Sequence, residues 1–202
     1  MPSPNSTHLN NQLRQQCRRK RRALTATTQK KHAQAACLIA RRTRWFQTPK
    51  KIGCFLAQDG ELATDPLIQA LNTHHQFYLP VLKTLRGRPM AFAPYYPDNR
   101  MAANQFNIDE PVIAHQHHLG AHQLDLILMP LTCFDDNGHR IGMGGGFYDQ
   151  SLAFKRLFPT RLKPILIGWA HECQKVSNIA PAPWDQPLDA LITEKHLYQF
   201  TK

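Results

Sequence analysis

Acidic residues are absent from the first 50 positions of this chain of 202 residues, and long apolar runs are absent throughout. No window approaches the roughly 20 uncharged apolar residues that a membrane-spanning helix needs. The opening residues also lack the apolar stretch of a secretory signal. The five cysteines form no C-x-x-C pair, which argues against a disulfide framework and a structural zinc cage. These absences favour a reducing compartment, and we expect the cytoplasm.

Positive charge is concentrated at the amino terminus. Residues 1–50 hold 12 Lys and Arg and no acid, whereas residues 51–202 hold 13 basic and 14 acidic residues, so +12 and −1 give the net +11. The basic segment is therefore attached to a nearly neutral body. Three interpretations stay open: an arm for nucleic acid or a membrane surface, a cationic segment facing a small polyanionic ligand, or a solvated helix face.

Helical periodicity predicts that the basic segment, residues 8–45, forms two helices, and we expect residues 1–7 to fray. The first helix carries apolar residues at helical spacing: Leu9, Leu13 and Cys17. Thr25 is the expected N-cap of the second helix. Its expected inner face comprises Ala33, Ala36, Cys37 and Ala40.

Beyond position 50, short apolar runs alternate with helical stretches. Strands are expected over residues 51–57, 77–82, 90–93, 124–129, 165–169 and 188–192. Pro80 suggests that its strand ends there or lies at an edge. Thr64 or Asp65, followed by Pro66, predicts a helix start. This alternation predicts one α/β domain over residues 1–202, layered around a mostly parallel sheet.

A glycine-rich turn follows the strongest predicted strand. Glycines at 142, 144, 145 and 146 precede a helix expected from Phe147 to Lys155. Such a turn lets backbone N–H groups approach an anion, and the helix start adds about half a positive charge. The pattern is neither G-x-G-x-x-G nor a Walker motif, and glycine-rich turns are often only flexible loops. A phosphate site is therefore predicted, with a plain loop as the alternative.

Asp149 strengthens the phosphate interpretation. A carboxylate beside bound phosphate is tolerated when a cation such as Mg²⁺ lies between the two. The alternative is an ordinary acid in the first turn of a helix, stabilised by the helix dipole.

The run Phe134 to Asp149, FDDNGHRIGMGGGFYD, resembles the signature of the 5-formyltetrahydrofolate cyclo-ligase (5,10-methenyltetrahydrofolate synthetase) family. Further segments resemble the family in the same order: Arg14–Thr25, Phe55–Ile68 and Leu188–Ile192. The resemblance implies an α/β domain of the sugar-phosphate isomerase and CoA-transferase type. It also implies that ATP and Mg²⁺ drive conversion of 5-formyltetrahydrofolate to 5,10-methenyltetrahydrofolate, ADP and phosphate. In that reaction ATP phosphorylates the formyl oxygen and N10 closes the ring, so no covalent nucleophile is expected.

The resemblance also assigns site residues. The implied ATP contacts are Asn10, Arg14, Arg140, Ile141, Gly142, Met143, Gly144, Gly145, Gly146, Phe147 and Tyr148. The implied folate contacts are Leu56, Glu61, Gly145, Gly146, Phe147 and Tyr148. Asp149 and Asp189 are expected to share one Mg²⁺ at the carboxyl ends of neighbouring strands, since an aspartate in an apolar strand needs a partner. Asn10 stands where the family has a lysine, so this phosphate contact stays open between Asn10 and Arg18.

Two other functions stay open. A nucleic-acid-binding protein would use the basic helices, and a sugar-phosphate isomerase or CoA-transferase would use the same kind of fold. The second would need a general base or an acyl-accepting carboxylate that the sequence does not identify. The histidines at 115, 117, 118 and 122 are interpreted as a polar loop with adventitious metal affinity. We expect a monomer that binds 5-formyltetrahydrofolate and ATP, and neither nucleic acid nor membrane.

Overall fold

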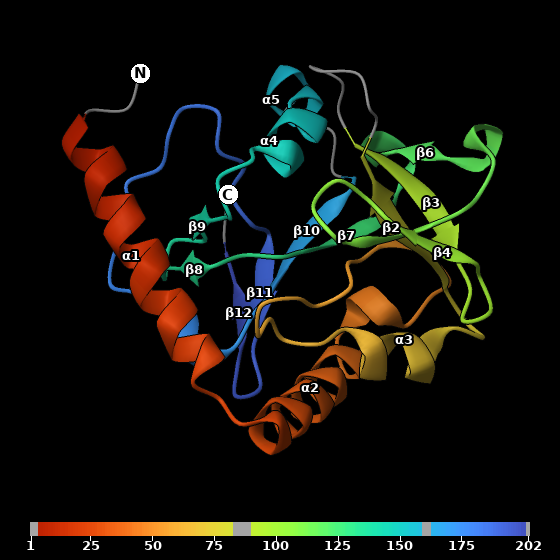
Figure 1. Ribbon diagram of the computed structural model, residues 1–202, viewed down its shortest axis with the longest axis horizontal. Coiled ribbons are helices and arrows are strands. Elements are labelled where there is room, and N and C mark those ends of the chain that lie inside the picture. The colour runs from red at the N-terminus through yellow and green to blue at the C-terminus, as the bar shows by residue number, and fades with distance from the viewer. Residues whose placement is uncertain (1–3, 83–89, 159–162, 201–202) are drawn as a thin grey trace.

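The computed structural model describes residues 4–82, 90–158 and 163–200 (Figure 1). Its α-helices are α1 (Pro4–Arg22), α2 (Ala26–Arg41), α3 (Asp65–Leu71), α4 (Phe147–Ser151) and α5 (Phe154–Leu157). Short 3-10 turns are η1 (Arg44–Phe46), η2 (His115–His117), η3 (Ala121–Gln123) and η4 (Glu172–Gln174). None of the helices in this described part is long and apolar enough to cross a bilayer.

Eight strands form the main sheet, in the order β12-β11-β10-β7-β1-β2-β3-β6. Their bounds are β1 (Lys51–Gly53), β2 (Gln76–Val81), β3 (Ala91–Tyr95), β6 (Leu119–Gly120), β7 (Leu126–Met129), β10 (Ile165–Trp169), β11 (Ala190–Ile192) and β12 (Leu197–Gln199). The five central strands from β11 to β2 are parallel, while β12, β3 and β6 join antiparallel at the two sides. The predicted α/β fold with a mostly parallel sheet is confirmed.

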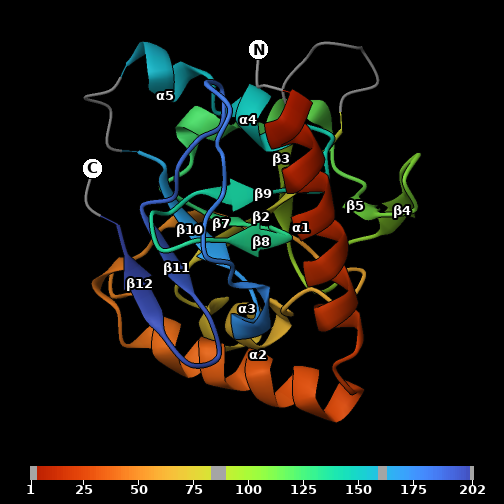
Figure 2. The same ribbon diagram turned by 90° about the vertical axis from the view of Figure 1, so that its left-hand side faces the viewer.

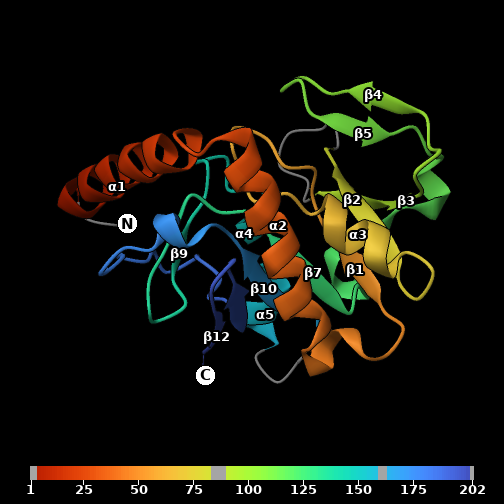
Figure 3. The same ribbon diagram turned by 90° about the horizontal axis from the view of Figure 1, so that it is seen from below.

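Apolar cores lie on both faces of the sheet, because the central strands are buried on both sides. In β7, Leu126 and Leu128 pack toward α2 and α3, whereas Ile127 and Met129 pack on the opposite face beside α4. Figure 3 shows α2 lying across the strands. The prediction for α2 is confirmed: the Thr25 hydroxyl accepts a hydrogen bond from the Thr28 amide, and the alanine and cysteine face is buried.

Helix α1 does not pack on the main sheet. It covers the small hairpin β8 (Cys133–Phe134) and β9 (Arg140–Ile141), which lies between the helix and the sheet (Figures 1 and 2). A third apolar cluster joins helix and hairpin through Cys17, Cys133 and Ile141. The helix is therefore held against the segment that carries the glycine-rich turn.

Several sequence predictions need correction. Helix α1 begins at Pro4, earlier than the helical segment expected from residue 8, while residues 1–3 lie outside the described part. The helix expected from Phe147 to Lys155 is broken into α4 and α5. Residues 95–120, for which the sequence analysis expected no strand, contain β6 and a hairpin of β4 (Met101–Ala103) and β5 (Asp109–Pro111).

The strand that contains Pro80 is not at an edge, because β2 lies between β1 and β3. The pairing with β1 ends at Tyr78, so the missing N–H of Pro80 deprives no β1 residue of a ladder hydrogen bond. Asp189 lies one residue before β11 rather than inside a strand, and β11 is not the last strand of the chain.

Candidate active site

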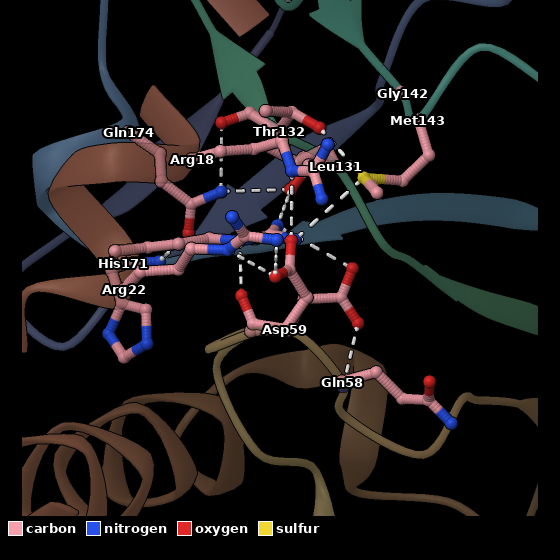
Figure 4. A network of polar contacts seen from close by, with 12 residues as sticks. Arg18, Arg22, Gln58, Asp59, Leu131, Thr132, Gly142, Met143, His171 and Gln174 are labelled. Carbon is pink, nitrogen blue, oxygen red and sulfur yellow. Dashed lines mark hydrogen bonds and ion pairs between the residues drawn. The ribbon is translucent and has the colours of Figure 1, made fainter. Parts of the chain in front are cut away.

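Three arginines of α1 converge on Asp59, which lies in the loop after β1 (Figure 4). Arg18 Nε donates to Asp59 Oδ2 at 2.9 Å, and Arg21 donates to the same oxygen at 3.0 Å. Arg22 pairs with Asp59 Oδ1. Partial burial alone would raise the pKa of Asp59, but the bonds from Arg22, Arg18 and Arg21 hold it below its usual value. The carboxylate therefore stays ionised and fixes the helix to the loop.

Arg21 is the centre of this network and is fully buried. Its guanidinium also donates to the Leu131 carbonyl at 3.2 Å and lies 3.5 Å from Glu61 Oε1. The sequence analysis did not single out Arg21. The signal was available, because Leu13, Cys17 and Arg21 are spaced by four residues and so share one helix face. The inward face of α1 thus delivers a buried cation beside Glu61.

The glycine-rich turn lies against α1 through Arg14. Arg14 Nε donates to the Gly142 carbonyl at 2.8 Å, and its guanidinium also contacts Asn11. Gly144 has φ +105° and Gly146 has φ +65°, values that side chains rarely tolerate, so these positions need glycine. Residues 143–146 are exposed. The predicted Arg14 and the predicted turn are therefore neighbours, with backbone amides open to a ligand.

Tyr148 and Glu61 lie on the inner side of the turn. Burial, followed by the Glu61 carboxylate, raises the pKa of the Tyr148 hydroxyl. That hydroxyl is buried and has no hydrogen-bond partner among the residues that the structure describes. The buried Arg140 Nε likewise has no partner there. Burial also raises the pKa of Glu61, which accepts a bond from the Gln58 amide at 3.1 Å. Unpaired buried polar groups are costly, so they mark a place where a polar ligand is expected.

The hairpin β4–β5 extends to this place. The Phe106 ring stacks edge-on against Phe147 at 5.9 Å, and the Gln58 side chain donates to the Asn107 carbonyl at 3.5 Å. Phe106 is half exposed, so an aromatic face is free beside the turn. Sequence analysis missed Phe106 because nothing in its local pattern links residue 106 to residue 147.

Of the remaining predicted contacts, Met143 and Gly145 lie near the residues described above, whereas Ile141 and Leu56 pack against apolar clusters. Met143 lies near the network, with its sulfur 3.8 Å from Arg21 and 3.5 Å from the Thr132 hydroxyl. Gly145 lies against the Phe147 ring. Ile141 is buried under α1, and Leu56 packs partly buried against the core on the α2 side. Because its side chain is buried, Ile141 cannot contact a ligand through that side chain unless the structure rearranges. Its backbone leads directly into the glycine-rich turn.

Asn10 is occupied elsewhere. Its amide nitrogen donates to the Ala180 carbonyl at 3.0 Å, and its buried Oδ1 accepts no hydrogen bond from any described residue. An acceptor repels phosphate oxygens, so this geometry does not suit Asn10 for the role of the lysine. Arg18, the alternative, is bound to Asp59 and is one third exposed. Of the two, only Arg18 presents donors that suit phosphate.

Asp149 and Asp189 have separate surroundings. Asp149 Oδ1 accepts bonds from Arg140 at 2.6 Å and from the Gln186 amide at 3.1 Å. Asp189 Oδ2 accepts from the Leu166 amide at 2.8 Å, at the amino ends of β10 and β11. The expectation that both lie at the carboxyl ends of strands is therefore wrong for Asp189.

Asp185 is the acid that the sequence analysis missed near Asp149. It adjoins Gln186 in the chain, and both residues line a cavity of about 170 Å³ together with Arg140. Its Oδ2 accepts a bond from the Ala182 amide at 2.8 Å. The loop before β11 thus brings this second carboxylate to the region of Asp149. No local motif marks Asp185, because only the return of that loop places it there.

Comparisons with known proteins identify the family of this chain. Residues 6–194 match the 5-formyltetrahydrofolate cyclo-ligase family. The 5-formyltetrahydrofolate cyclo-ligase of Escherichia coli K12 is 35% identical over 91% of this chain and 99% of its own length. That of Haemophilus influenzae is 36% identical over 91% and 96%. The solved 5,10-methenyltetrahydrofolate synthetase of Aquifex aeolicus superposes with a TM-score of 0.79 at 25% identity, over 96% of this chain and 94% of that one. The chain belongs to the 5-formyltetrahydrofolate cyclo-ligase family.

Proposed function

We propose that this protein converts 5-formyltetrahydrofolate to 5,10-methenyltetrahydrofolate, with ATP consumed and ADP and phosphate released. One observation carries the proposal beyond family membership: a glycine-rich turn open to an anion lies beside a buried glutamate, and α1 contacts both. Arg14 of that helix binds the Gly142 carbonyl, and Arg21 lies beside Glu61. A phosphate subsite and a folate subsite would then adjoin one another.

The ATP subsite is proposed at the turn and α1. Exposed backbone amides of residues 143–146 would bind phosphate oxygens, and the Arg14 guanidinium would add charge-assisted bonds. Arg18 would contribute in place of the family's lysine. Arg140, whose Nε is unpaired, is a further donor facing the same region.

The folate subsite is proposed around Glu61. A carboxylate accepts two coplanar hydrogen bonds from the amino and ring N–H groups of a pterin. Leu56, Phe147 and Tyr148 would supply apolar and aromatic contacts, and Phe106 would add an aromatic face from the β4–β5 hairpin. Arg21 keeps part of the negative charge of Glu61 compensated while the pterin is absent.

The donor set near the turn fits Mg²⁺. Asp149 is bonded through Oδ1 and keeps 18% of its side chain exposed, and Asp185 adjoins Gln186, whose amide is bonded to Asp149. Mg²⁺ takes one or two carboxylates and completes its shell with water and phosphate oxygens. We therefore propose Asp149 as one ligand and favour Asp185 over Asp189 as the second. The ion would neutralise charge on the phosphates.

The residues proposed here act by position and charge rather than by covalent chemistry. The ATP subsite, with Arg14, Arg18 and the turn, would hold the γ-phosphoryl group against the formyl oxygen. The folate subsite around Glu61 would hold the pterin so that N10 faces the activated carbon. Arginine donors would stabilise the charge that develops on the transferring group. No nucleophilic side chain is required in this scheme.

The function is tested by incubating the protein with 5-formyltetrahydrofolate, ATP and Mg²⁺ while recording the near-ultraviolet absorbance of the methenyl product. We expect turnover to need all three components, with one phosphate released per product. Equal turnover without ATP would refute the phosphorylation scheme.

We propose that the enzyme works as a cytoplasmic monomer without nucleic acid. Binding to nucleic acid that persists at physiological salt would contradict the last point.

A further inference from the structure

Two histidines and a glutamate converge outside the proposed catalytic residues. His32 lies on α2, His171 follows β10, and Glu194 follows β11. His32 Nδ1 is 3.0 Å from His171 Nδ1 and 3.6 Å from Glu194 Oε1. Among the residues that the structure describes, this is the one cluster of three metal-ligating side chains whose donor atoms all lie within 4.8 Å of one another.

The spacing suits a single metal ion. Two nitrogens bound to one tetrahedral Zn²⁺ at about 2.0 Å lie roughly 3.3 Å apart, so the two Nδ1 atoms need to separate by only a few tenths of an ångström. A carboxylate oxygen completes a His₂Glu set, which is a donor set of zinc sites and leaves a fourth position open. Imidazole nitrogens favour Zn²⁺ over Mg²⁺. The alternative is a purely hydrogen-bonded chain from Glu194 through His32 to His171.

The buried ring of His171 favours the metal. The ring is fully buried, and within the described part of the chain its Nε2 makes no hydrogen bond of normal geometry, although the Gly60 backbone lies beside the ring. With Nδ1 on a metal, Nε2 carries the proton and needs an acceptor, as metal-bound histidines commonly find in a backbone carbonyl.

The surrounding groups support the same assignment. Glu194 Oε2 accepts the Glu172 amide at 2.9 Å, which leaves Oε1 directed at His32. Arg21, a fixed cation that acts on His171, is paired with Asp59 and Glu61. Figure 4 shows His171 at the edge of that arginine network. Because β10 and β11 are parallel neighbours, their carboxyl ends bring His171 and Glu194 together beneath α2.

We propose that His32, His171 and Glu194 form a Zn²⁺ site, separate from the Mg²⁺ site near Asp149. The ion would tie α2 to the carboxyl ends of β10 and β11. These ligands come from positions 32, 171 and 194, so the ion would link segments that are distant in the chain. Its expected effect is on the stability of the fold, and it does not depend on the proposed reaction.

The test uses the full chain, freed of metal with a chelator and then titrated with Zn²⁺ by calorimetry. Co²⁺ serves as a second probe, because its visible absorption reports ligand number and geometry. The variants are His32→Ala, whose side chain is 22% exposed, and Glu194→Gln, which keeps an oxygen to accept the bond from the Glu172 amide, so both should fold. The control is His117→Ala, an exposed histidine of the competing polar loop.

We expect one Zn²⁺ per chain, bound at least about 10–100-fold more weakly by His32→Ala and Glu194→Gln, the loss that follows removal of even an outer partner. Zn²⁺ should also raise the melting temperature of the wild type and of His117→Ala, but not of the two ligand variants. Absence of stoichiometric Zn²⁺ binding would overturn the proposal. Binding that survives in His32→Ala but is lost in His117→Ala would also overturn it, and would assign the metal to the polar loop.

Discussion

Replacement of Asp59 by asparagine tests whether the arginine network holds α1 in place. Asp59 is the shared partner of Arg18, Arg21 and Arg22, and its side chain is 21% exposed. The substitution keeps the shape but removes the charge. Arg21 is fully buried, so it is the arginine that loses the most stabilisation. Its remaining carboxylate partner, Glu61, is 3.5 Å away.

The magnitude follows from what Arg21 keeps and what it loses. Removing one partner of a buried ion pair costs about 3–5 kcal/mol. Arg21 retains its bonds to the Asp59 and Leu131 carbonyls and its proximity to Glu61, so the cost should fall at or below the lower end of that range. We expect Asp59→Asn to lose about 2–3 kcal/mol of unfolding free energy. For a chain of this size that corresponds to a fall in Tm of about 5–10 °C.

The assay is urea unfolding followed by circular dichroism, with thermal melting as a second measure. Asp136→Asn is the matched control, because Asp136 pairs with Lys175 but is 64% exposed, and such pairs contribute about 0–1 kcal/mol. Arg22→Ala is a second control, since that arginine is 54% exposed. The difference between Asp59→Asn and wild type should shrink as the pH falls below 3.8 through the lower native pKa, because the wild-type carboxylate then loses its charge.

A loss for Asp59→Asn no larger than that for Asp136→Asn would refute the reasoning. It would mean that Arg21 is adequately paired by Glu61 and the carbonyls alone. A stability difference that grows toward acid pH would likewise contradict the assigned direction of the Asp59 pKa.

Three further predictions concern activity. Arg14→Ala should raise the apparent KM for ATP far more than the KM for folate, by the equivalent of about 1.5–3 kcal/mol for a lost charge-assisted bond. Steady-state kinetics measure both constants, and equal changes in the two would mean that Arg14 serves only to hold the helix. Glu61→Gln should weaken folate binding with ATP binding nearly normal. Because burial raises the pKa of Glu61, the wild-type KM for folate should rise as the pH falls through that pKa, and a variant with the same pH profile would contradict this. Asp149→Asn and Asp185→Asn should need much more Mg²⁺ for activity, whereas Asp189→Asn should keep the wild-type Mg²⁺ titration. A raised Mg²⁺ requirement in Asp189→Asn but not in Asp185→Asn would instead support the pairing of Asp149 with Asp189.

Local chemistry was readable from the sequence. Thr25 as an N-cap and the buried face of α2 follow from side-chain type and a period of 3.6 residues, which need no knowledge of distant segments. The parallel sheet follows from apolar runs buried on both faces, as Leu126 to Met129 show. The glycine-rich turn was recognisable because positive φ values require glycine in the sequence itself.

The tertiary structure decided everything that depends on distant partners. Arg21 looks like its charged neighbours in the chain, yet it is buried because Asp59 and Glu61 meet it. Asp189 was expected at the wrong end of its strand, because strand boundaries are set by pairing, and Asp185 comes near Asp149 only through the returning loop. His32, His171 and Glu194 are separated by up to 162 positions, and only the parallel pairing of β10 with β11 beneath α2 joins them. A sequence specifies its local conformations directly, whereas a site built across the sheet exists only once long-range packing has fixed which strand ends are neighbours.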